Sequence, residues 1–221
     1  MRVAALITGG KDSALALNRV LRAGYKVEYL VTMIPQREDS WMFHFPNIGL
    51  TDLFAEASGI PLIKAETSGI KEEEVEDLKC TLAKIDVEGV VSGAISSEYQ
   101  KSRINKICKD LGVMSIIPLW HEDPLKLMME LIDLSFKIII VGVYALGFDK
   151  SWLGREINSS TLNELANMHR RYQISLVGEG GEYETLVLFA PYFGKRIRVV
   201  EAEVVWQDDS GYLSVKKAEL V

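Results

Sequence analysis

The stretch "RVAALITGGKDSALALNRVLRAG" (residues 2–24) runs from an apolar segment through a glycine-rich turn into a helical pattern. Its first part, residues 2–8, is apolar without helical spacing, which suits a strand buried on both faces of a parallel sheet. From Lys11 onward apolar residues recur at the spacing of a helix, and Gly24 is a suitable stop. A strand, a tight turn and a helix in this order predict an α/β fold.

The alternation of strand and helix continues to about Trp120. We therefore predict an α/β domain with a parallel nucleotide-binding sheet over residues 1–120, covered by helices on both faces. The glycine-rich turn then lies at the carboxyl end of the first strand, where open α/β sheets bind ligands. The other expected elements are strands at 26–34, 60–67, 88–95 and 113–120, and helices at 49–59, 71–86 and 97–112.

After Trp120 the regularity fades, and residues 121–221 predict a smaller C-terminal α+β domain that binds substrate, or a large elaboration of the first domain. The chain contains no internal repeat. Its expected elements are helices at 123–136 and 159–172, the latter capped by Ser159 or Ser160, strands at 137–146 and 183–189, and a hairpin over 195–220 about the "DDSG" turn.

The bulk composition indicates a soluble globular protein. The chain has 221 residues, of which 48% are hydrophobic and 25% charged, so it can bury a sizeable core. The formal net charge of −6 argues mildly against wholesale binding to nucleic acid or to an anionic membrane, although a local basic patch would survive that average. The longest apolar run, 138–148, is too short to span a bilayer.

The cysteines indicate a cytoplasmic protein. Cys80 and Cys108 have no CxxC spacing, and with three scattered histidines they form no zinc-ligand pattern. We expect reduced thiols. The residues after Met1 lack the layout of a signal peptide.

The glycine-rich turn has the features of an anion site. Backbone N–H groups at a helix start have no internal partner, and the helix dipole places partial positive charge there. Gly9 and Gly10 let the backbone approach an anion, and Lys11 adds a full positive charge that we expect to be exposed at the helix start. A tight strand-to-helix connection that uses glycine for geometry alone is the alternative.

The side chains next to the glycines indicate which kinds of phosphate-binding loop are possible. The hydroxyls of Thr8 and Ser13 can donate to phosphate oxygens, whereas Asp12 would repel a phosphate unless it bound a metal ion or the turn itself. The spacing excludes the Walker pattern GxxxxGK[ST] and the dinucleotide pattern GxGxxG. A different phosphate-binding loop is therefore expected.

A second segment, "SGAISSEYQKSRINKIC" (92–108), places Ser96 and Ser97 just past a strand, again at the carboxyl edge of the sheet. Lys101 and Arg103 then fall in the first turns of the next helix. Cations there oppose the helix dipole, so a bound anion would offset their cost. A solvated helix face is the alternative.

A third segment, "GEGGEYETLVL" (178–188), places Glu179, Glu182 and Glu184 among three glycines before an apolar strand. The glycines fit a backbone that turns tightly or admits a ligand. Clustered carboxylates could hold Mg²⁺, a cationic substrate or ammonium. A flexible acidic surface loop is the alternative.

The three segments together resemble the diphthine–ammonia ligase family of PP-loop ATP pyrophosphatases. "TGGKDS" resembles the SGGxDS loop of that superfamily, with Thr8 in place of the usual serine and the hydroxyl retained. "EGGEYET" (179–185) is the segment specific to the family, and "TMIPQREDSWMFHFPN" (32–47) and "GIPL" (59–62) also resemble its N-terminal half. The resemblance covers essentially the whole chain.

The resemblance implies ATP and Mg²⁺ as cofactors, ammonium as nitrogen donor and the diphthine side chain of translation elongation factor 2 as substrate. The carboxylate would attack the α-phosphate of ATP to form an acyl-adenylate, and ammonia would then give diphthamide and AMP, with pyrophosphate released. The implied ATP-binding residues are Thr8, Gly9, Gly10, Lys11, Asp12, Ser13, Met33, Gly93, Ser96 and Ser97. The implied substrate-binding residues are Tyr99, Gln100, Glu179, Gly180, Gly181, Glu182, Tyr183, Glu184 and Thr185.

Lys11, Asp12, Lys101 and Arg103 are assigned to catalysis, with Asp12 orienting the loop or binding Mg²⁺. Ligation of another carboxylate and a non-catalytic ATP-binding regulator stay open as alternatives. Neither cysteine has the context of a thiolation enzyme or a built-in glutaminase, so ammonia is expected free or from a partner. We expect no nucleic-acid or membrane partner, and the oligomeric state stays open, a homo-oligomer included. Trp41, Phe43 and Phe45 could serve adenine, substrate or a subunit interface.

Overall fold

The first sheet is parallel and has five strands, as the sequence predicts. The computed structural model describes residues 1–35, 47–68, 70 and 72–221. The strand order is β3-β2-β1-β4-β5, which places β1 and its following turn at the centre. These strands are β1 (Arg2–Leu6), β2 (Lys26–Pro35), β3 (Leu62–Thr67), β4 (Gly89–Val91) and β5 (Met114–Ile116).

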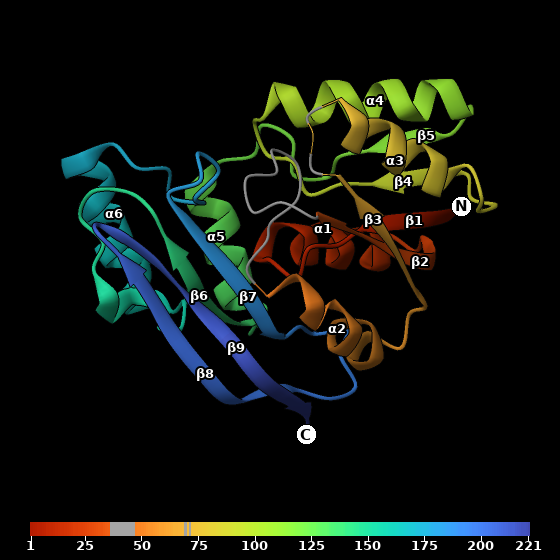
Figure 1. Ribbon diagram of the computed structural model, residues 1–221. Coiled ribbons are helices and arrows are strands. Elements are labelled where there is room, and N and C mark those ends of the chain that lie inside the picture. Colours follow the sequence, from red (N-terminus) through yellow and green to blue (C-terminus); the bar gives the residue numbers. More distant parts are fainter. Residues whose placement is uncertain (36–46, 69, 71) are drawn as a thin grey trace.

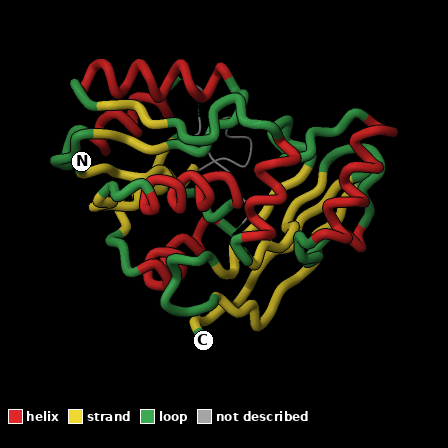
Figure 2. Tube along the Cα trace, turned by 180° about the vertical axis from the view of Figure 1, so that it is seen from behind, coloured by secondary structure: helices red, strands yellow, loops and turns green. Residues whose placement is uncertain are grey.

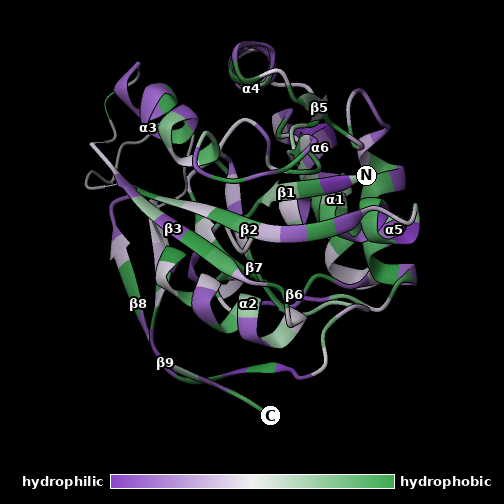
Figure 3. Cartoon of the chain, turned by 90° about the vertical axis from the view of Figure 1, so that its right-hand side faces the viewer, coloured by the Kyte–Doolittle hydropathy of each residue, from purple (hydrophilic) through white to green (hydrophobic). Residues whose placement is uncertain are grey.

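Helices cover both faces of this sheet (Figure 1). α1 (Lys11–Arg22) and α2 (Thr51–Ser58) pack on one face, and α3 (Glu73–Leu82) and α4 (Glu98–Leu111) pack on the other. Hydrophilic and hydrophobic residues are interspersed along these helices (Figure 3). This arrangement confirms the predicted α/β class, and α1 ends before Gly24, whose φ of +82° terminates the helix as expected.

The strands β4 and β5 are shorter than predicted. Ser92 still donates its N–H to Ile116 at 3.0 Å, after which the chain leaves the sheet. Ala94 and Ile95 nevertheless stay buried, with exposed fractions of 5% and 3%. The apolar run thus continues past the last residue of β4 because the loop that follows the strand is itself buried.

The second sheet is antiparallel with the order β7-β6-β9-β8, and helices pack on one of its faces (Figure 2). The β8–β9 hairpin turns at residues 208–209, as predicted. The predicted cap of the last helix is wrong: Asn158 is the N-cap, because its side-chain oxygen accepts the N–H of Thr161 at 3.0 Å. The elements are α5 (Pro124–Asp133), β6 (Lys137–Val143), α6 (Ser159–Tyr172), β7 (Tyr183–Phe189), β8 (Ile197–Gln207) and β9 (Ser210–Leu220), with short 3₁₀ turns η1 (Ile48–Leu50) and η2 (Lys150–Trp152).

One cluster of buried apolar side chains spans both sheets. Leu17 on α1 belongs to the same cluster as Ile140 on β6 and Val187 on β7. Phe54 on α2 meets Phe193 edge-on at a centroid distance of 4.8 Å, which is a favoured aromatic geometry. The division into domains at residue 120 stays a prediction, because the two sheets share this core.

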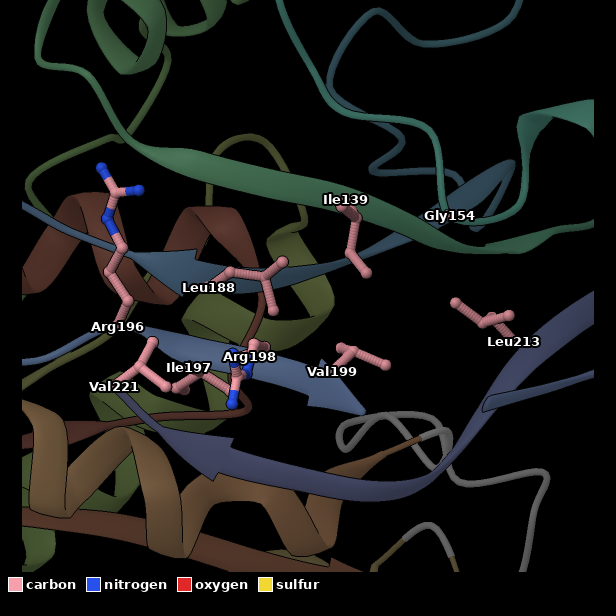
Figure 4. Close-up of a pocket in the computed structure, with 9 residues that line it drawn as sticks. All are labelled: Ile139, Gly154, Leu188, Arg196, Ile197, Arg198, Val199, Leu213 and Val221. Atoms are coloured by element: carbon pink, nitrogen blue, oxygen red, sulfur yellow. The ribbon is translucent and has the colours of Figure 1, made fainter. Parts of the chain in front are cut away.

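A cavity of about 460 Å³ lies where the hairpin diverges from β6. β6 and β9 pair only at Gly142–Tyr212 and Val143–Gly211. Beyond these pairs, Ile139 and Leu188 face the hairpin residue Val199 across the cavity (Figure 4). The described residues that line this cavity differ from those of the predicted site.

Two further expectations concern membrane-spanning helices and the state of the two cysteines. Among the residues that the structure describes, every helix is too short or too polar to cross a bilayer. Both cysteines are free, Cys80 exposed and Cys108 buried, as expected of reduced thiols. Burial raises the pKa of the Cys108 thiol to about 11, so it stays protonated at neutral pH.

Candidate functional site

The glycine-rich turn connects the end of β1 to α1 at the carboxyl edge of the parallel sheet. Gly9 has a φ of +84°, a conformation that side-chain-bearing residues rarely adopt. Gly10 is the N-cap of α1 and has no side chain to cap the helix. Within the described ranges, no acceptor faces the N–H groups of Gly9, Gly10 or Asp12. The turn therefore keeps backbone donors for an anion.

Lys11 is not exposed, contrary to expectation. Only 3% of its surface is accessible. Its Nζ donates to the carbonyl of Val177 and lies 2.9 Å from Asp12 Oδ2. The ring of Tyr183 lies 5.4 Å from Nζ, within range of a cation–π contact. Burial results because residues from the C-terminal half close over the start of α1.

The hydroxyl of Ser13 braces the turn from within. It donates to the carbonyl of Gly10 at 3.1 Å and accepts the N–H of Thr8 at 3.4 Å. Asp12 keeps 35% of its side chain exposed while pairing with Lys11. Asp12 thus contacts Lys11 while part of its carboxylate side chain remains accessible.

Strand β7 holds the turn from the second sheet. Thr185 Oγ1 accepts the N–H of Lys11 at 3.1 Å, and Val187 donates its N–H to the carbonyl of Gly9 at 2.9 Å. The next part of the chain adds a third contact, since the hydroxyl of Tyr192 donates to the carbonyl of Ala14 at 3.0 Å. The phosphate-loop candidate is therefore built from both halves of the chain.

The segment after β4 packs directly against the start of α1. A Cβ atom on Gly93 would lie 2.7 Å from the backbone carbon of Asp12 and 2.7 Å from the nitrogen of Ser13, so only glycine fits. Ser97 caps α4, its hydroxyl accepting the N–H of Gln100 at 3.4 Å. The structure thus brings "GAISS" beside "TGGKDS", as the sequence predicts for adjacent strands.

Glu179 reaches this segment from the C-terminal half. Its Oε1 accepts the N–H groups of Ile95 at 3.1 Å, Ser96 at 2.5 Å and Ser97 at 2.9 Å. The hydroxyl of Ser96 donates to Oε2. The anion beside the start of α4 is therefore a carboxylate of the protein itself.

The carboxylates of Glu179 and Glu182 in "EGGEYET" have different partners. Glu182 Oε1 accepts the N–H of Ser175 at 2.7 Å within the same loop, whereas Glu179 faces the other sheet. Across the described part of the chain, no group of three or more His, Cys, Asp or Glu could hold a metal ion. Glu179 and Glu182 are therefore each held by hydrogen bonds to backbone N–H groups, which differs from the expected flexible acidic surface loop.

The three glycines of the same loop are required for different structural reasons. Gly178 and Gly181 have φ values of +67° and +81°. A Cβ on Gly180 would lie 2.9 Å from the carboxylate oxygen of Glu182. Tyr183 is buried, and burial raises the pKa of its phenol well above the usual range, so its hydroxyl stays a donor to the carbonyl of Leu176 at 2.6 Å. Tyr183 supports the loop and Lys11 from the core.

The predicted cations of α4 already have partners. Lys101 Nζ lies 3.9 Å from the ring centre of Trp120, a residue that sequence reasoning did not single out. Arg103 stacks on Tyr99 at 3.5 Å and pairs with Glu72 at 2.7 Å. The sequence offered one signal for Trp120: it is an aromatic residue at the carboxyl end of the predicted strand 113–120.

Two groups of predicted residues lie away from this arrangement or outside it. Met33 has 1% of its surface exposed. Its side chain packs with Leu78 and Ile104 in a second cluster of buried apolar residues, so it faces no opening. Trp41, Phe43 and Phe45 lie outside the described residues.

The fold and the site together define an α/β protein with a glycine-rich turn at the carboxyl edge of its central strand, contacted by a strand of a second sheet. The chain belongs to the diphthamide synthase family: residues 1–115 match the model of the diphthamide synthase N-terminal domain, and residues 123–221 match that of the C-terminal domain.

Relatives named diphthine–ammonia ligase support this membership. The human one is 35% identical over 93% of this chain and 85% of that protein, and the one from Bos taurus is 34% identical over 97% and 89%. The relative from Schizosaccharomyces pombe is 33% identical over 98% of this chain, which spans only 39% of that protein's length.

Proposed function

We propose that this protein is a carbon–nitrogen ligase that uses ATP to amidate diphthine, a modified histidine of translation elongation factor 2, with ammonium. The observation that carries the proposal is the match of both halves to the diphthamide synthase models. The contact between "TGGKDS", "GAISS" and "EGGEYET" at one sheet edge supports it, because each half alone would leave the site incomplete.

The proposed chemistry has two steps. An oxygen of the diphthine carboxylate attacks the α-phosphate of ATP, the bond from that phosphorus to the β-phosphate oxygen breaks, and pyrophosphate leaves. Ammonia then attacks the carbonyl carbon of the acyl-adenylate, AMP leaves with the electron pair of the broken C–O bond, and a proton is lost from nitrogen. Most of the protein's contribution is positioning and charge neutralisation.

We assign the N–H groups of Gly9 and Gly10 to the β- and γ-phosphates. Lys11 would act as a fixed positive charge behind the turn, since its ammonium is buried beside Asp12. Lys101 and Arg103 would face the α-phosphate or the substrate carboxylate. The exposed carboxylate of Asp12 fits Mg²⁺, which commonly binds one or two carboxylates together with substrate phosphates.

A direct experiment tests the proposal. The protein is incubated with ATP, Mg²⁺, ammonium and elongation factor 2 that carries diphthine, and the nucleotide product and the mass of the factor are measured. We expect AMP and the mass change of amidation. ADP would exclude adenylation, AMP without a mass change would indicate another carboxylate, and ATP binding without turnover would indicate a regulator.

A further inference from the structure

Glu179 joins the two halves of the chain at the predicted ATP site. Its carboxylate accepts the three N–H groups of residues 95–97 and the hydroxyl of Ser96. Both carboxylate oxygens are therefore engaged, and a cationic ligand would have to compete with charge-assisted hydrogen bonds. This use of the side chain differs from the substrate contact that the sequence suggests.

The loop that presents Glu179 is braced on its own. Ser175 donates its N–H to Glu182 Oε1 at 2.7 Å, and Gly178 donates to the carbonyl of Ser175 at 3.1 Å. Gly181 closes a further turn on the carbonyl of Gly178 at 3.1 Å. Because none of these contacts uses the Glu179 carboxylate, the loop keeps its shape when that carboxylate is removed.

The segment that receives the carboxylate depends on it more strongly. Within the described residues, the N–H groups of Ile95, Ser96 and Ser97 have no other acceptor. They precede α4, whose N-terminal end favours a negative charge. Lys101, in the second turn of α4, donates its N–H to the carbonyl of Ser97 at 3.0 Å. The placement of this segment thus also sets the position of Lys101.

We propose that Glu179 is a positioning residue that fixes residues 95–97 and the start of α4 for nucleotide binding, and that it does not contact the substrate. The inference rests on the proposed function, in which this segment contacts ATP. The proposal predicts that ATP affinity depends on the carboxylate group of Glu179, so that a small free carboxylate can replace this group when the side chain is removed.

The experiment measures ATP affinity by calorimetry for the wild type, Glu179→Ala and Glu98→Ala. Glu98 is the matched control, because it lies beside the same segment with 71% of its side chain exposed and only a 3.9 Å contact to Lys101. We expect about tenfold weaker ATP binding for Glu179→Ala, the loss typical of charge-assisted hydrogen bonds, and no change for Glu98→Ala. Added formate should restore binding in Glu179→Ala alone.

Kinetics supply the second measurement. We expect the KM for ATP to rise in Glu179→Ala while the KM for modified elongation factor 2 stays constant. A rise confined to the KM of the factor, or weakened ATP binding that formate leaves unrestored, would overturn the proposal. Glu179→Gln, which retains an acceptor oxygen, gives an intermediate affinity and provides the same comparison if the alanine variant does not fold. Failure of the wild type to bind ATP would instead contradict the proposed function.

Discussion

Two glycine-rich segments meet in this molecule, and their glycines serve different ends. At residues 8–13 the N–H groups of Gly9 and Gly10, before α1, have no acceptor among the residues that the structure describes. At residues 178–185 the glycines permit turns and make room for the side chain of Glu182, whose Oε1 accepts the N–H of Ser175, whereas its Oε2 is buried without a hydrogen-bond partner among the described residues. The first segment therefore keeps the backbone donors on which the proposed phosphate contacts depend, and Thr185 of the second segment accepts the N–H of Lys11 in the first.

The difference teaches how charge is distributed around the site. Lys11, from the first segment, is buried against Val177, which precedes the second segment, and against Tyr183, which belongs to it. Glu179, from the second, supplies the negative charge beside α4. Lys11 and Glu179, which look available in the sequence, thus each have a partner in the other half of the chain, whereas Lys101 and Arg103 have partners within the first half.

Replacing Lys11 tests the first segment most severely. Lys11→Met keeps most of the side-chain volume but removes the charge behind the turn, so we expect AMP formation to fall roughly 100-fold or more. The lost hydrogen bond to Val177 should also lower the free energy of unfolding by about 1–3 kcal/mol. Nucleotide turnover and thermal melting measure the two effects. Turnover equal to that of the wild type would remove Lys11 from the mechanism.

Gly93→Ala tests the close contact between the loop after β4 and α1. Its Cβ would lie 2.7 Å from the backbone of Asp12, so we expect a loss of roughly 1–3 kcal/mol in the free energy of unfolding. Denaturant titration measures it. Gly49→Ala is the matched control, because a Cβ there meets no atom within 4 Å and should change stability by under about 0.5 kcal/mol. Equal effects of the two variants would show that the contact carries no strain.

Thr185→Val tests whether the second segment holds the first. The N–H of Lys11 would lose its acceptor, and we expect the free energy of unfolding to fall by about 1 kcal/mol and the KM for ATP to rise. Thr185→Ser retains the hydroxyl and should behave like the wild type. If the serine and valine variants had the same KM, the hydroxyl would play no part in ordering the turn.

The fold was largely predictable because its signals are local. The apolar run before Gly9 and the helical spacing after Lys11 each depend on neighbouring residues only, and the alternation repeats along the first half. Errors arose where tertiary contacts decide. Ile95 is apolar and buried, yet it lies in a loop: its side chain belongs to a core cluster that includes residues of the C-terminal half, and its N–H is bound by Glu179.

The meeting of the candidate segments at one sheet edge was predictable, but their individual contacts were not. The carboxyl ends of parallel strands share one edge, so the nearness of Gly93 to Asp12 follows from topology. The partner of Glu179 is 83 residues away in Ser96, and that of Lys11 is 166 residues away in Val177. No sequence periodicity links such positions, so the burial of Lys11 and the pairing of Glu179 required the three-dimensional structure.

The smallest expected effect concerns the support that Tyr183 gives from the core. Burial raises the pKa of its phenol, so the folded state keeps a proton that the unfolded state releases above about pH 10. Its contribution to stability is therefore complete below the unfolded pKa and is lost as the pH rises toward the folded pKa. Tyr183→Phe should make alkaline unfolding less steep while leaving the ring beneath Lys11. Denaturant titration at pH 8 and pH 11 measures the difference, and an unchanged pH dependence would mean that the phenol is not protected from solvent in the folded protein.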